Sequence, residues 1–435
     1  HRVDRRQRQM CIRDRITNKE TFMNNYLNQS ELNEDLYPIV KEICDQVKFR
    51  GDDALKEYNL KLDKVETSQL SVSKEDLFTA YQRIDSSIRE ALEQSHDRIK
   101  AYQMSIKQEH QQDNSECYEI YHPLERVGVY VPGGKASYPS TVLMTVTLAK
   151  VAGVKNIVVV TPPQIEGIPD IVLAACYIAG VDQVYQVGGA QSIAALAYGT
   201  ETIPKVDKIV GPGNQYVAYA KKYLYGQVGI DQIAGPSEIA LIIDRSADIN
   251  AITYDVFAQA EHDELARTFV ISEDKDLLQQ LENNIQKTLR QIKRQPIVEA
   301  SLKHNHFLIS VENFTEACDL MNQIAPEHAS IQTQCPHDYI NHVKYVGALF
   351  LGHYSPEVIG DYIAGPSHVL PTNQTARFTN GLSVNDFLMR HSVIDLSQQT
   401  FKNIEQSARK LAHIEHLYNH EQSIEMRTTK EPHND

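Results

Sequence analysis

The sequence predicts an α/β fold built on doubly wound parallel sheets, and two observations carry this prediction. Fourteen of the 20 glycines lie in residues 121–236, where they follow short β-branched runs and precede apolar helical stretches. A second alternation of strand and helix patterns follows over residues 237–383. Repeated alternation of this kind is typical of parallel sheets whose two faces are covered by helices.

The segment that precedes these runs is expected to be helical. Residues 1–120 contain a single glycine and a single proline, and apolar residues recur at spacings of three and four between Leu36 and Val47. Ser73, with Glu75 and Asp76 in the turn that follows it, predicts a capped helix start. We therefore expect a helical N-terminal segment over residues 16–120 that serves packing or dimerisation, because no cluster of reactive side chains occurs in it.

Residues 1–15 differ from the rest of the chain, because they carry six Arg and two Asp and no apolar run. We interpret them as a non-native or disordered tail that lies outside the fold. A genuine basic tail is the alternative.

The first α/β run is expected to end its strands in glycine loops. Strands are predicted at residues 127–132, 156–160, 182–187 and 208–210, and helices at 140–151, 169–179 and 192–198 and behind residue 214. Ligands of doubly wound sheets bind beyond the carboxyl ends of the strands, where the loops 188–191 and 211–214 lie. Their glycines suit the close approach of a nucleotide or a phosphate, but tight turns alone explain them equally well.

The second run predicts another sheet followed by a helical tail. Strands are expected at residues 239–243, 268–272, 307–311, 329–332 and 348–351, and helices at 250–265, 275–294 and 314–324. From residue 384 onward the pattern is helical.

Composition excludes several classes of protein. A net charge of −14 disfavours binding to a phosphate backbone, so no nucleic-acid partner is expected. The longest apolar runs, such as 171–181, reach about half of the roughly 20 residues that a membrane helix needs. The cysteines form no CxxC pair, which favours a reduced, cytoplasmic setting without disulfides or zinc fingers; they are residues 11, 44, 117, 176, 318 and 335.

Two short patterns bring together residues that suit metal or proton chemistry. Gln259 and His262 lie three residues apart near a helix end and share a face, although spacing alone nominates Asp263 or Glu264 over an amide. Glu327 and His328 follow a proline that stops a helix, and a carboxylate beside an imidazole suits acid–base catalysis. A solvated helix end and an ordinary polar loop are the simpler interpretations.

The chain resembles the histidinol dehydrogenase family over residues 16–430. The resemblance is carried by VGVYVPGG (127–134), STVLMT (140–145), the run 187–214, IDQIAGPSE (230–238), AQAEH (258–262), APEH (325–328), GDYIAGPSHVLPT (360–372) and LAHIEHLYNHEQS (411–423). Ser367 departs from the family, whose members often have Asn at this position.

This resemblance implies a zinc-dependent oxidation of L-histidinol to L-histidine with two NAD⁺, at the end of histidine biosynthesis. It implies that Glu327 and His328 are the acid–base pair. The zinc ligands that it implies are Gln259, His262, Asp361 and His420. The residues implied to line the NAD pocket are Tyr130, Gln191 and Asn214. The substrate is implied to contact Ser237, His368 and Glu415, together with His328 and the four zinc ligands.

The resemblance also implies a domain organisation and an assembly. Residues 121–236 would be a Rossmann-like NAD-binding domain and residues 237–383 a second Rossmann-like domain with the zinc and the catalytic residues. Residues 384–435 would be a helical tail in an intertwined homodimer, where Glu415 and His420 reach the active site of the other subunit. A mixed nitrogen and oxygen ligand set without cysteine suits a zinc ion that keeps positions open for substrate.

Two alternatives stay open at this point. One is a zinc and NAD dehydrogenase for another amino alcohol or polyol. The other is a non-catalytic paralogue, which would be expected to lose part of the set formed by Glu327, His328 and the four zinc ligands.

Overall fold

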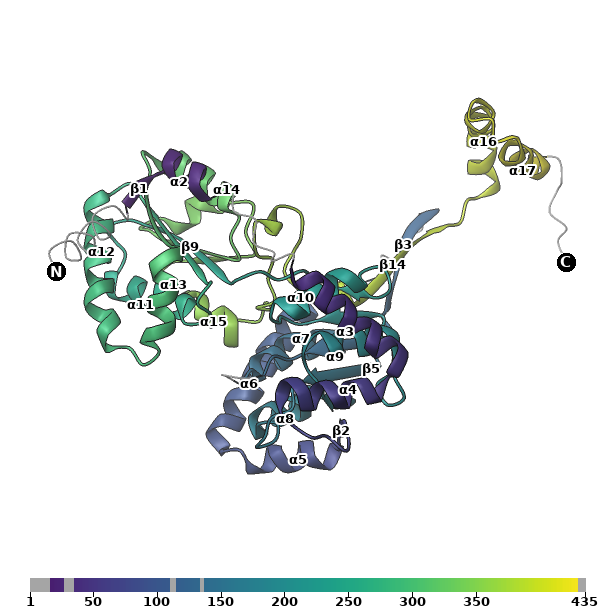
Figure 1. The fold of residues 1–435 in the computed structure, drawn as a ribbon. Coiled ribbons are helices and arrows are strands. Elements are labelled where there is room, and N and C mark those ends of the chain that lie inside the picture. Colours follow the sequence, from purple (N-terminus) through teal and green to yellow (C-terminus); the bar gives the residue numbers. More distant parts are fainter. Residues whose placement is uncertain (1–15, 27–34, 110–114, 134–136, 429–435) are drawn as a thin grey trace. The chain divides into compact units, whose positions relative to one another are not determined.

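The computed structural model describes residues 16–26, 35–109, 115–133 and 137–428. The chain divides into two units (Figure 1). The main unit comprises residues 1–107 and 124–387, and the small unit comprises residues 108–123 and 388–435. None of the helices in the described parts of the chain is long and apolar enough to cross a membrane.

The first sheet of the main unit has the strand order β2-β6-β5-β4-β7-β8. Its five parallel strands are β4 (Arg126–Tyr130), β5 (Asn156–Thr161), β6 (Gln183–Gln186), β7 (Lys208–Val210) and β8 (Gly229–Ile230), and β2 (Ser71–Val72) adds an antiparallel edge. The chain moves from β4 to β5 to β6 and then crosses back to β7. The order of the strands therefore reverses between β4 and β7, which is the position where doubly wound sheets bind ligands.

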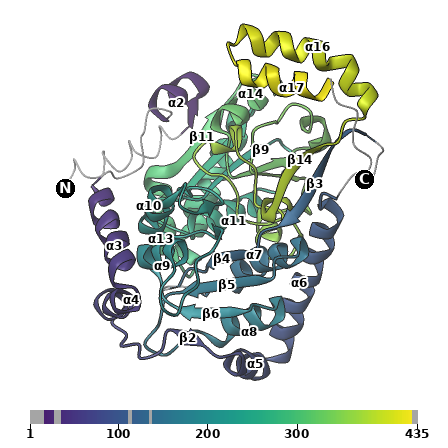
Figure 2. The same ribbon diagram turned by 90° about the vertical axis from the view of Figure 1, so that its right-hand side faces the viewer.

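Helices cover both faces of this sheet (Figure 2). One layer contains α3 (Leu36–Arg50), α4 (Asp52–Tyr58), α9 (Gly189–Tyr198) and α10 (Gln215–Leu224), which pack against one another. The other layer contains α5 (Lys74–Arg83), α6 (Ser86–Ile106), α7 (Pro139–Ala152) and α8 (Asp170–Ala179). The central strand β5 is buried from Ile157 to Thr161, as expected for a sheet that is covered on both sides.

The second sheet is entirely parallel and has the order β1-β11-β10-β9-β12-β13. Its strands are β1 (Ile16–Asn18), β9 (Glu238–Ile243), β10 (Arg267–Ser272), β11 (His306–Ser310), β12 (His328–Gln332) and β13 (Ala348–Leu351). One buried cluster joins it to α11 (Ile249–Ala260), α12 (Lys275–Thr288) and α13 (Gln295–Asn305), and another joins it to α2 (Lys19–Tyr26) and α14 (Phe314–Ile324). Figure 1 shows these helices around β9. The prediction of α/β architecture with doubly wound parallel sheets is confirmed.

Short strands interrupt the two segments that were expected to be helical. Within residues 16–120, β1 pairs with β11, β2 pairs with β6, and β3 (Cys117–Pro123) pairs with β14. Within the tail, β14 (Leu388–Ile394) precedes the helices. The partners of β1, β2 and β3 lie more than 100 residues away along the chain, so the local pattern carries no signal for these pairings.

The small unit consists of the β3–β14 ribbon, α16 (Gln398–Ile414) and α17 (Tyr418–Thr428). An ion pair of Arg409 with Glu425 and a hydrogen bond between His413 Nδ1 and Glu421 Oε2 join its two helices. Ala412 is the one buried residue of α16, and large apolar side chains stay exposed around the turn between the helices; they are Leu411, Ile414, Leu417 and Tyr418.

The remaining elements are short. They are the π-helical turn η1 (Asn59–Asp63), α15 (Glu357–Tyr362) and the 3₁₀ turns η2 (Leu289–Gln291), η3 (Pro336–Tyr339), η4 (Thr375–Arg377) and η5 (Val384–Phe387).

Candidate functional site

Three residues expected to line a nucleotide pocket gather at the carboxyl edge of the first sheet. Tyr130 is the last residue of β4, and its buried hydroxyl accepts a hydrogen bond from the Gly189 amide at 3.4 Å. Gln191 lies in the first turn of α9, and its buried Oε1 has no hydrogen-bond partner among the described residues. Asn214 caps α10, where its Oδ1 accepts from the Val217 amide at 3.2 Å.

Two glycines let the loops at this edge touch. Gly211 has a φ of +108°, and a Cβ at this position would collide with the carbonyl oxygen of Tyr130. A Cβ at Gly188 would collide with the ring of Pro162. Packing between neighbouring loops therefore requires both glycines, whether or not a ligand is bound.

A buried ion pair fixes the loop that begins at Gly211. The Lys221 ammonium lies 2.7 Å from Asp231 Oδ1 and donates to the Gly211 carbonyl at 2.6 Å. The other oxygen of Asp231 accepts from the Gly211 amide at 2.7 Å. Both side chains are almost fully buried, so each charge depends on the other.

Glu327 and His328 lie at the amino edge of the second sheet. Ala325 caps the carboxyl end of α14, and its φ of +46° turns the chain. His328 is then the first residue of β12 and not part of a loop. Glu327 Oε2 accepts from the Glu238 amide at 3.0 Å, and His328 Nδ1 lies 3.1 Å from the Glu238 carbonyl oxygen. The main chain of one residue in β9 thus orients both side chains, which are buried.

These contacts define the protonation of the pair. A carbonyl oxygen can only accept, so Nδ1 of His328 carries the proton and Nε2 keeps its lone pair. Burial lowers the pKa of His328 to about 3, which keeps the imidazole neutral. Burial also raises the pKa of Glu327 well above its usual range.

Side chains that suit a metal ion lie beside His328. Donor atoms of His262, Glu357 and Asp361 all lie within 4.8 Å of one another. His328 Nε2 lies 3.9 Å from Asp361 Oδ1, and His262 Nε2 lies 3.9 Å from Asp361 Oδ2. His262 follows the last turn of α11 and its side chain is 43% exposed, so the cluster is open on this side.

Gln259 is a candidate ligand for the same cluster, because it lies three residues before His262 near the end of α11. It is fully buried near the end of α11, and neither its amide nitrogen nor its amide oxygen has a hydrogen-bond partner among the described residues. An unpaired buried amide is unfavourable, which points to a ligand for this side chain. Asp263 and Glu264, which spacing alone had nominated, are exposed.

Glu357 was missed by the sequence analysis. It is the first residue of α15 and lies four residues before Asp361, so both carboxyl groups share one face of this helix. Its two oxygens are buried without a hydrogen-bond partner among the described residues. The spacing of four was visible in the sequence, but nothing there indicated that residues 357–362 are helical.

The loop after α15 completes the site. His368 Nδ1 donates to the Asp361 carbonyl at 3.1 Å, and its Nε2 is buried without a partner among the described residues. Ser367 donates to the Met144 carbonyl at 2.8 Å, which ties the loop to α7. A cavity of about 320 Å³ opens here, and its lining includes His328, Asp361 and His368. Burial raises the pKa of Asp361 to about 7.

Three further residues were expected to contact the substrate or the metal. Ser237 directly precedes β9, and its carbonyl oxygen accepts from the Arg267 amide at 2.9 Å. Glu415 is the C-cap of α16 and His420 lies in α17, so both belong to the small unit and both are exposed.

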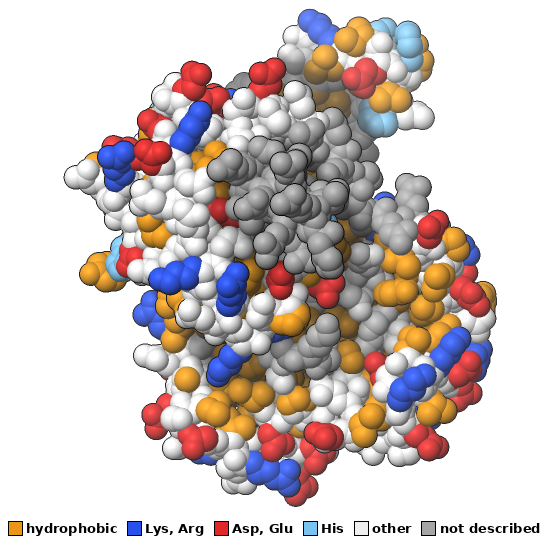
Figure 3. Space-filling view, turned by 60° about the vertical axis from the view of Figure 1, so that its left-hand side comes forward, with side chains coloured by type: hydrophobic (Ala, Val, Ile, Leu, Met, Phe, Trp, Pro, Cys, Tyr) orange, Lys and Arg blue, Asp and Glu red, His pale blue; other side chains and the backbone are white. Residues whose placement is uncertain are grey.

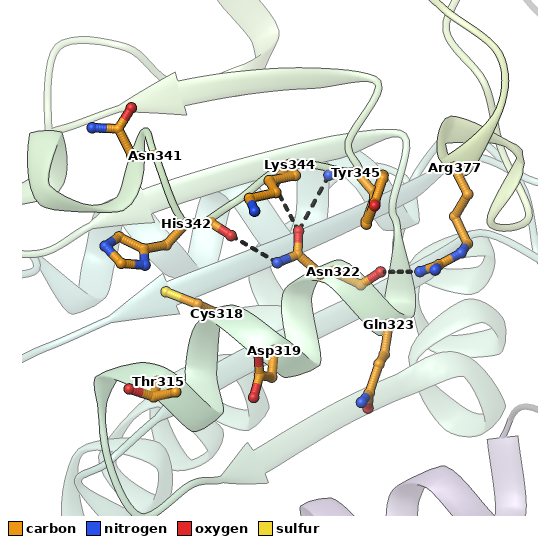
Figure 4. Close-up of a pocket in the computed structure, with 10 residues that line it drawn as sticks. All are labelled: Thr315, Cys318, Asp319, Asn322, Gln323, Asn341, His342, Lys344, Tyr345 and Arg377. Carbon is orange, nitrogen blue, oxygen red and sulfur yellow. Dashed lines mark hydrogen bonds between the residues drawn. The ribbon is translucent and has the colours of Figure 1, made fainter.

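A second cavity, of about 390 Å³, lies beside α14 and contains none of the expected site residues (Figure 4). Its polar groups hold the structure together: Asn322 donates to the His342 carbonyl, accepts from the Lys344 amide and accepts from Arg377 through its own carbonyl. Elsewhere, Lys and Arg side chains are interspersed with Asp and Glu over the described surface of one face (Figure 3).

Two parallel sheets, one edged by glycine loops and the other by buried acid, base and metal-binding groups, define an α/β enzyme. A family model described as histidinol dehydrogenase matches residues 27–428. Histidinol dehydrogenase of Staphylococcus saprophyticus is 78% identical over 416 residues, which cover 96% of this chain and 98% of that protein. Histidinol dehydrogenase of Staphylococcus aureus strain COL is 67% identical over 414 residues, 95% of this chain and 99% of that protein.

A solved structure agrees with these relatives. The crystal structure of histidinol dehydrogenase from Elizabethkingia anophelis aligns with a TM-score of 0.91 at 32% identity, covering 95% of this chain and 97% of that chain. The chain belongs to the histidinol dehydrogenase family, and it is an oxidoreductase.

Proposed function

We propose that this enzyme oxidises L-histidinol to L-histidine through L-histidinaldehyde, with zinc bound and with two NAD⁺ reduced. Family membership supports the substrate. The observation that carries the chemistry is the buried pair Glu327 and His328, oriented by the main chain of Glu238 and set beside the donor atoms of His262, Glu357 and Asp361.

Gln259, His262 and Asp361 would hold the zinc ion, with His420 supplied by the second subunit. The fit is supported by the unpaired buried amide of Gln259 and by a donor set of nitrogen and oxygen atoms, which zinc accepts. Zinc, when bound, acts as a Lewis acid that orients and polarises the substrate alcohol. Glu357 adds a carboxylate within reach of the same position.

His328 is the proposed base for the alcohol proton. Its Nδ1 proton is engaged by the Glu238 carbonyl, so the free lone pair is on Nε2, on the side of Asp361. Because the low pKa of His328 keeps the ring neutral, this lone pair is free to accept the proton as a hydride leaves the carbinol carbon for NAD⁺.

Glu327 is the proposed base for the second half of the reaction. The aldehyde must gain water before a second hydride can leave, and a carboxylate beside the base can deprotonate that water. Burial raises the pKa of Glu327, so its carboxylate is a stronger base than an exposed one. Retention of the aldehyde lets one site remove four electrons from the same carbon.

Ser237, His368 and Glu415 are the proposed groups that hold the substrate, with Glu415 suited to an imidazole N–H. His368 offers an Nε2 lone pair that is buried and unpaired within the described structure. Tyr130, Gln191 and Asn214 are the proposed contacts to NAD⁺ at the carboxyl edge of the first sheet, beside the amino ends of α9 and α10.

We also propose a homodimer in which Glu415 and His420 complete the site of the second subunit. The support is the small unit, which leaves Leu411, Ile414 and Tyr418 exposed on its two helices. The described cysteines are free thiols, which fits a location in the reducing cytoplasm.

The test is to count NADH formed for each L-histidinol consumed, before and after removal of metal by a chelator. Two NADH per substrate, lost on chelation and restored by Zn²⁺, is the expected result. Turnover of another amino alcohol or polyol without turnover of L-histidinol would instead favour a related dehydrogenase. No turnover of any alcohol by zinc-loaded protein would favour a non-catalytic paralogue.

A further inference from the structure

The π-helical turn η1 lies at the carboxyl edge of the first sheet. It belongs to the N-terminal segment, in which the sequence shows no cluster of reactive side chains. Asn59, its first residue, is fully buried. Its amide donates to the carbonyl oxygen of Gln186 at 3.0 Å, and Gln186 is the last residue of β6. A second bond, to Thr67 Oγ1 at 3.0 Å, fixes the turn from the other side. Single π-helical turns often mark functional positions.

Asp63 is the last residue of this turn, and one of its carboxyl oxygens is unsatisfied. Oδ2 is buried and has no hydrogen-bond partner among the described residues. The neighbouring cation does not neutralise it, because the Lys64 ammonium is bonded to the Lys61 carbonyl at 2.7 Å. Burial raises the pKa of Asp63 to about 6, so the carboxyl group is ionised at neutral pH.

Asp63 and Tyr130 lie at the same edge of the first sheet, because Asn59 of the turn is bonded to the end of β6 and the loop that follows β6 contacts Tyr130 through the Gly189 amide. Burial raises the pKa of the Tyr130 phenol to about 12, and the nearby charge of Asp63 contributes to this shift. Tyr130 in turn contacts the Gly189 amide, two residues before Gln191, whose Oε1 is also buried and unpaired. The carboxyl edge of the first sheet, where a dinucleotide is expected, therefore carries two buried acceptors that have no hydrogen-bond partner among the described residues.

Orphaned buried acceptors need donors, and a ribose supplies two adjacent hydroxyl donors. We propose that Asp63 is a further dinucleotide-binding residue, whose carboxylate accepts from the hydroxyl groups of the adenosine ribose of NAD⁺ and repels the 2′-phosphate of NADP⁺. An acidic residue serves this purpose in many dinucleotide folds, where it follows a strand of the sheet. Here it comes from a helical turn outside the α/β run.

This inference rests on the proposed use of NAD⁺, and direct binding separates the two. Binding of NAD⁺ and NADP⁺ is measured by calorimetry on the full-length zinc-loaded protein, for the unchanged chain and for Asp63→Asn, Asp63→Ser and the exposed control Glu66→Gln. We expect both Asp63 variants to bind NAD⁺ roughly 10-fold to 100-fold more weakly, the range for a hydrogen bond to a charged group. The preference over NADP⁺ should shrink by a similar factor, with the KM for L-histidinol unchanged.

Each outcome of this experiment decides either the role of Asp63 or the proposed function. Loss of NAD⁺ affinity in both Asp63 variants, with unchanged thermal unfolding and an unchanged Glu66→Gln control, supports the assignment. Unchanged affinity and unchanged preference in the folded Asp63 variants would overturn it while leaving the proposed function intact. Failure of the unchanged protein to bind either dinucleotide would instead contradict the proposed function.

Discussion

The two sheets of the main unit differ in the edge that carries the candidate site, which is the carboxyl edge of the first sheet and the amino edge of the second. In the first sheet, Tyr130 and the loop after β7 lie at the carboxyl ends of the strands. In the second sheet, His328 and Glu238 are the first residues of β12 and β9, so the acid–base groups lie at the amino ends. The connection 231–237 runs from the end of β8 directly to the start of β9, which joins one edge to the other.

The difference has an electrostatic reason. Carboxyl ends of parallel strands lead into the amino ends of α9 and α10, where free N–H groups and the helix dipole favour anions such as phosphate. Amino ends of strands receive the carboxyl end of α11, with Gln259 in its last turn and His262 just beyond it. Free carbonyl groups and the negative end of the dipole favour a cation there. The carboxyl edge of the first sheet thus favours anions, and the amino edge of the second sheet favours cations.

The largest effect is expected when Glu327, the acid at the amino edge of the second sheet, is replaced. Glu327→Gln should lower turnover of L-histidinaldehyde by roughly 1,000-fold, within the range for loss of a general base, and should affect the oxidation of L-histidinol to the aldehyde far less. The two half-reactions are followed separately by NADH formation from each substrate. Glu299→Gln, an exposed acid on α13, is the control. Equal loss in both halves would contradict the role assigned to Glu327.

The next largest effect is expected from the buried ion pair at the first edge. Lys221→Met leaves Asp231 charged and unpaired in the interior, which should lower the free energy of unfolding by about 3–5 kcal/mol. It should also raise the KM for NAD⁺, because the Gly211 loop loses its anchor. Urea unfolding and steady-state kinetics measure the two effects. Lys222→Met changes the exposed neighbour and should change neither.

A smaller effect is expected from backbone strain in the same loop. Gly211→Ala places a methyl group against the Tyr130 carbonyl at a φ that alanine avoids, so we expect the KM for NAD⁺ to rise roughly 10-fold while the KM for L-histidinol stays constant. Gly226→Ala is the matched control, since Gly226 has a φ of +98° and open space around its Cβ. A rise in both KM values would show that Gly211 does not act on one edge alone.

The smallest effect is expected from the protonation of Glu238, at the amino edge of the second sheet. Burial raises the pKa of Glu238 from its usual 4.5 to about 8, although the Asn373 amide donates to Glu238 Oε1 and opposes the shift. Arg267 Nη1 lies 3.6 Å from the same oxygen. Below pH 4.5 both the folded and the unfolded chain hold the proton. Between pH 4.5 and about 8 only the unfolded chain releases it, so stability falls as the pH rises.

Glu238→Gln should remove this dependence of the free energy of unfolding on pH. Its advantage over the unchanged protein should grow by at most about 1.4 kcal/mol per pH unit within that window, as measured by urea unfolding between pH 5 and pH 8. Glu166→Gln, an exposed acid, serves as the control. A variant that is less stable than the unchanged protein at pH 8 would show that Arg267 keeps Glu238 ionised.

The candidate site was recovered from the sequence only in part. The residues that the family resemblance indicated are Gln259, His262, Glu327, His328, Asp361 and His368, and in the structure they lie at one edge of the second sheet or in the loop beside it. Spacing alone preferred Asp263 and Glu264, which are exposed. Glu357 was missed because its importance depends on a short helix that the pattern did not reveal.

The sequence by itself determined the alternation of strands and helices, the glycine loops and the exclusion of a membrane helix, because these depend on neighbouring residues. Only the tertiary structure decided that β1 joins the second sheet, that Glu238 orients both members of the acid–base pair, and that the turn containing Asp63 is bonded to the end of β6. These facts depend on contacts between segments far apart in the chain, and on burial, which changes the pKa of a side chain without changing any local pattern.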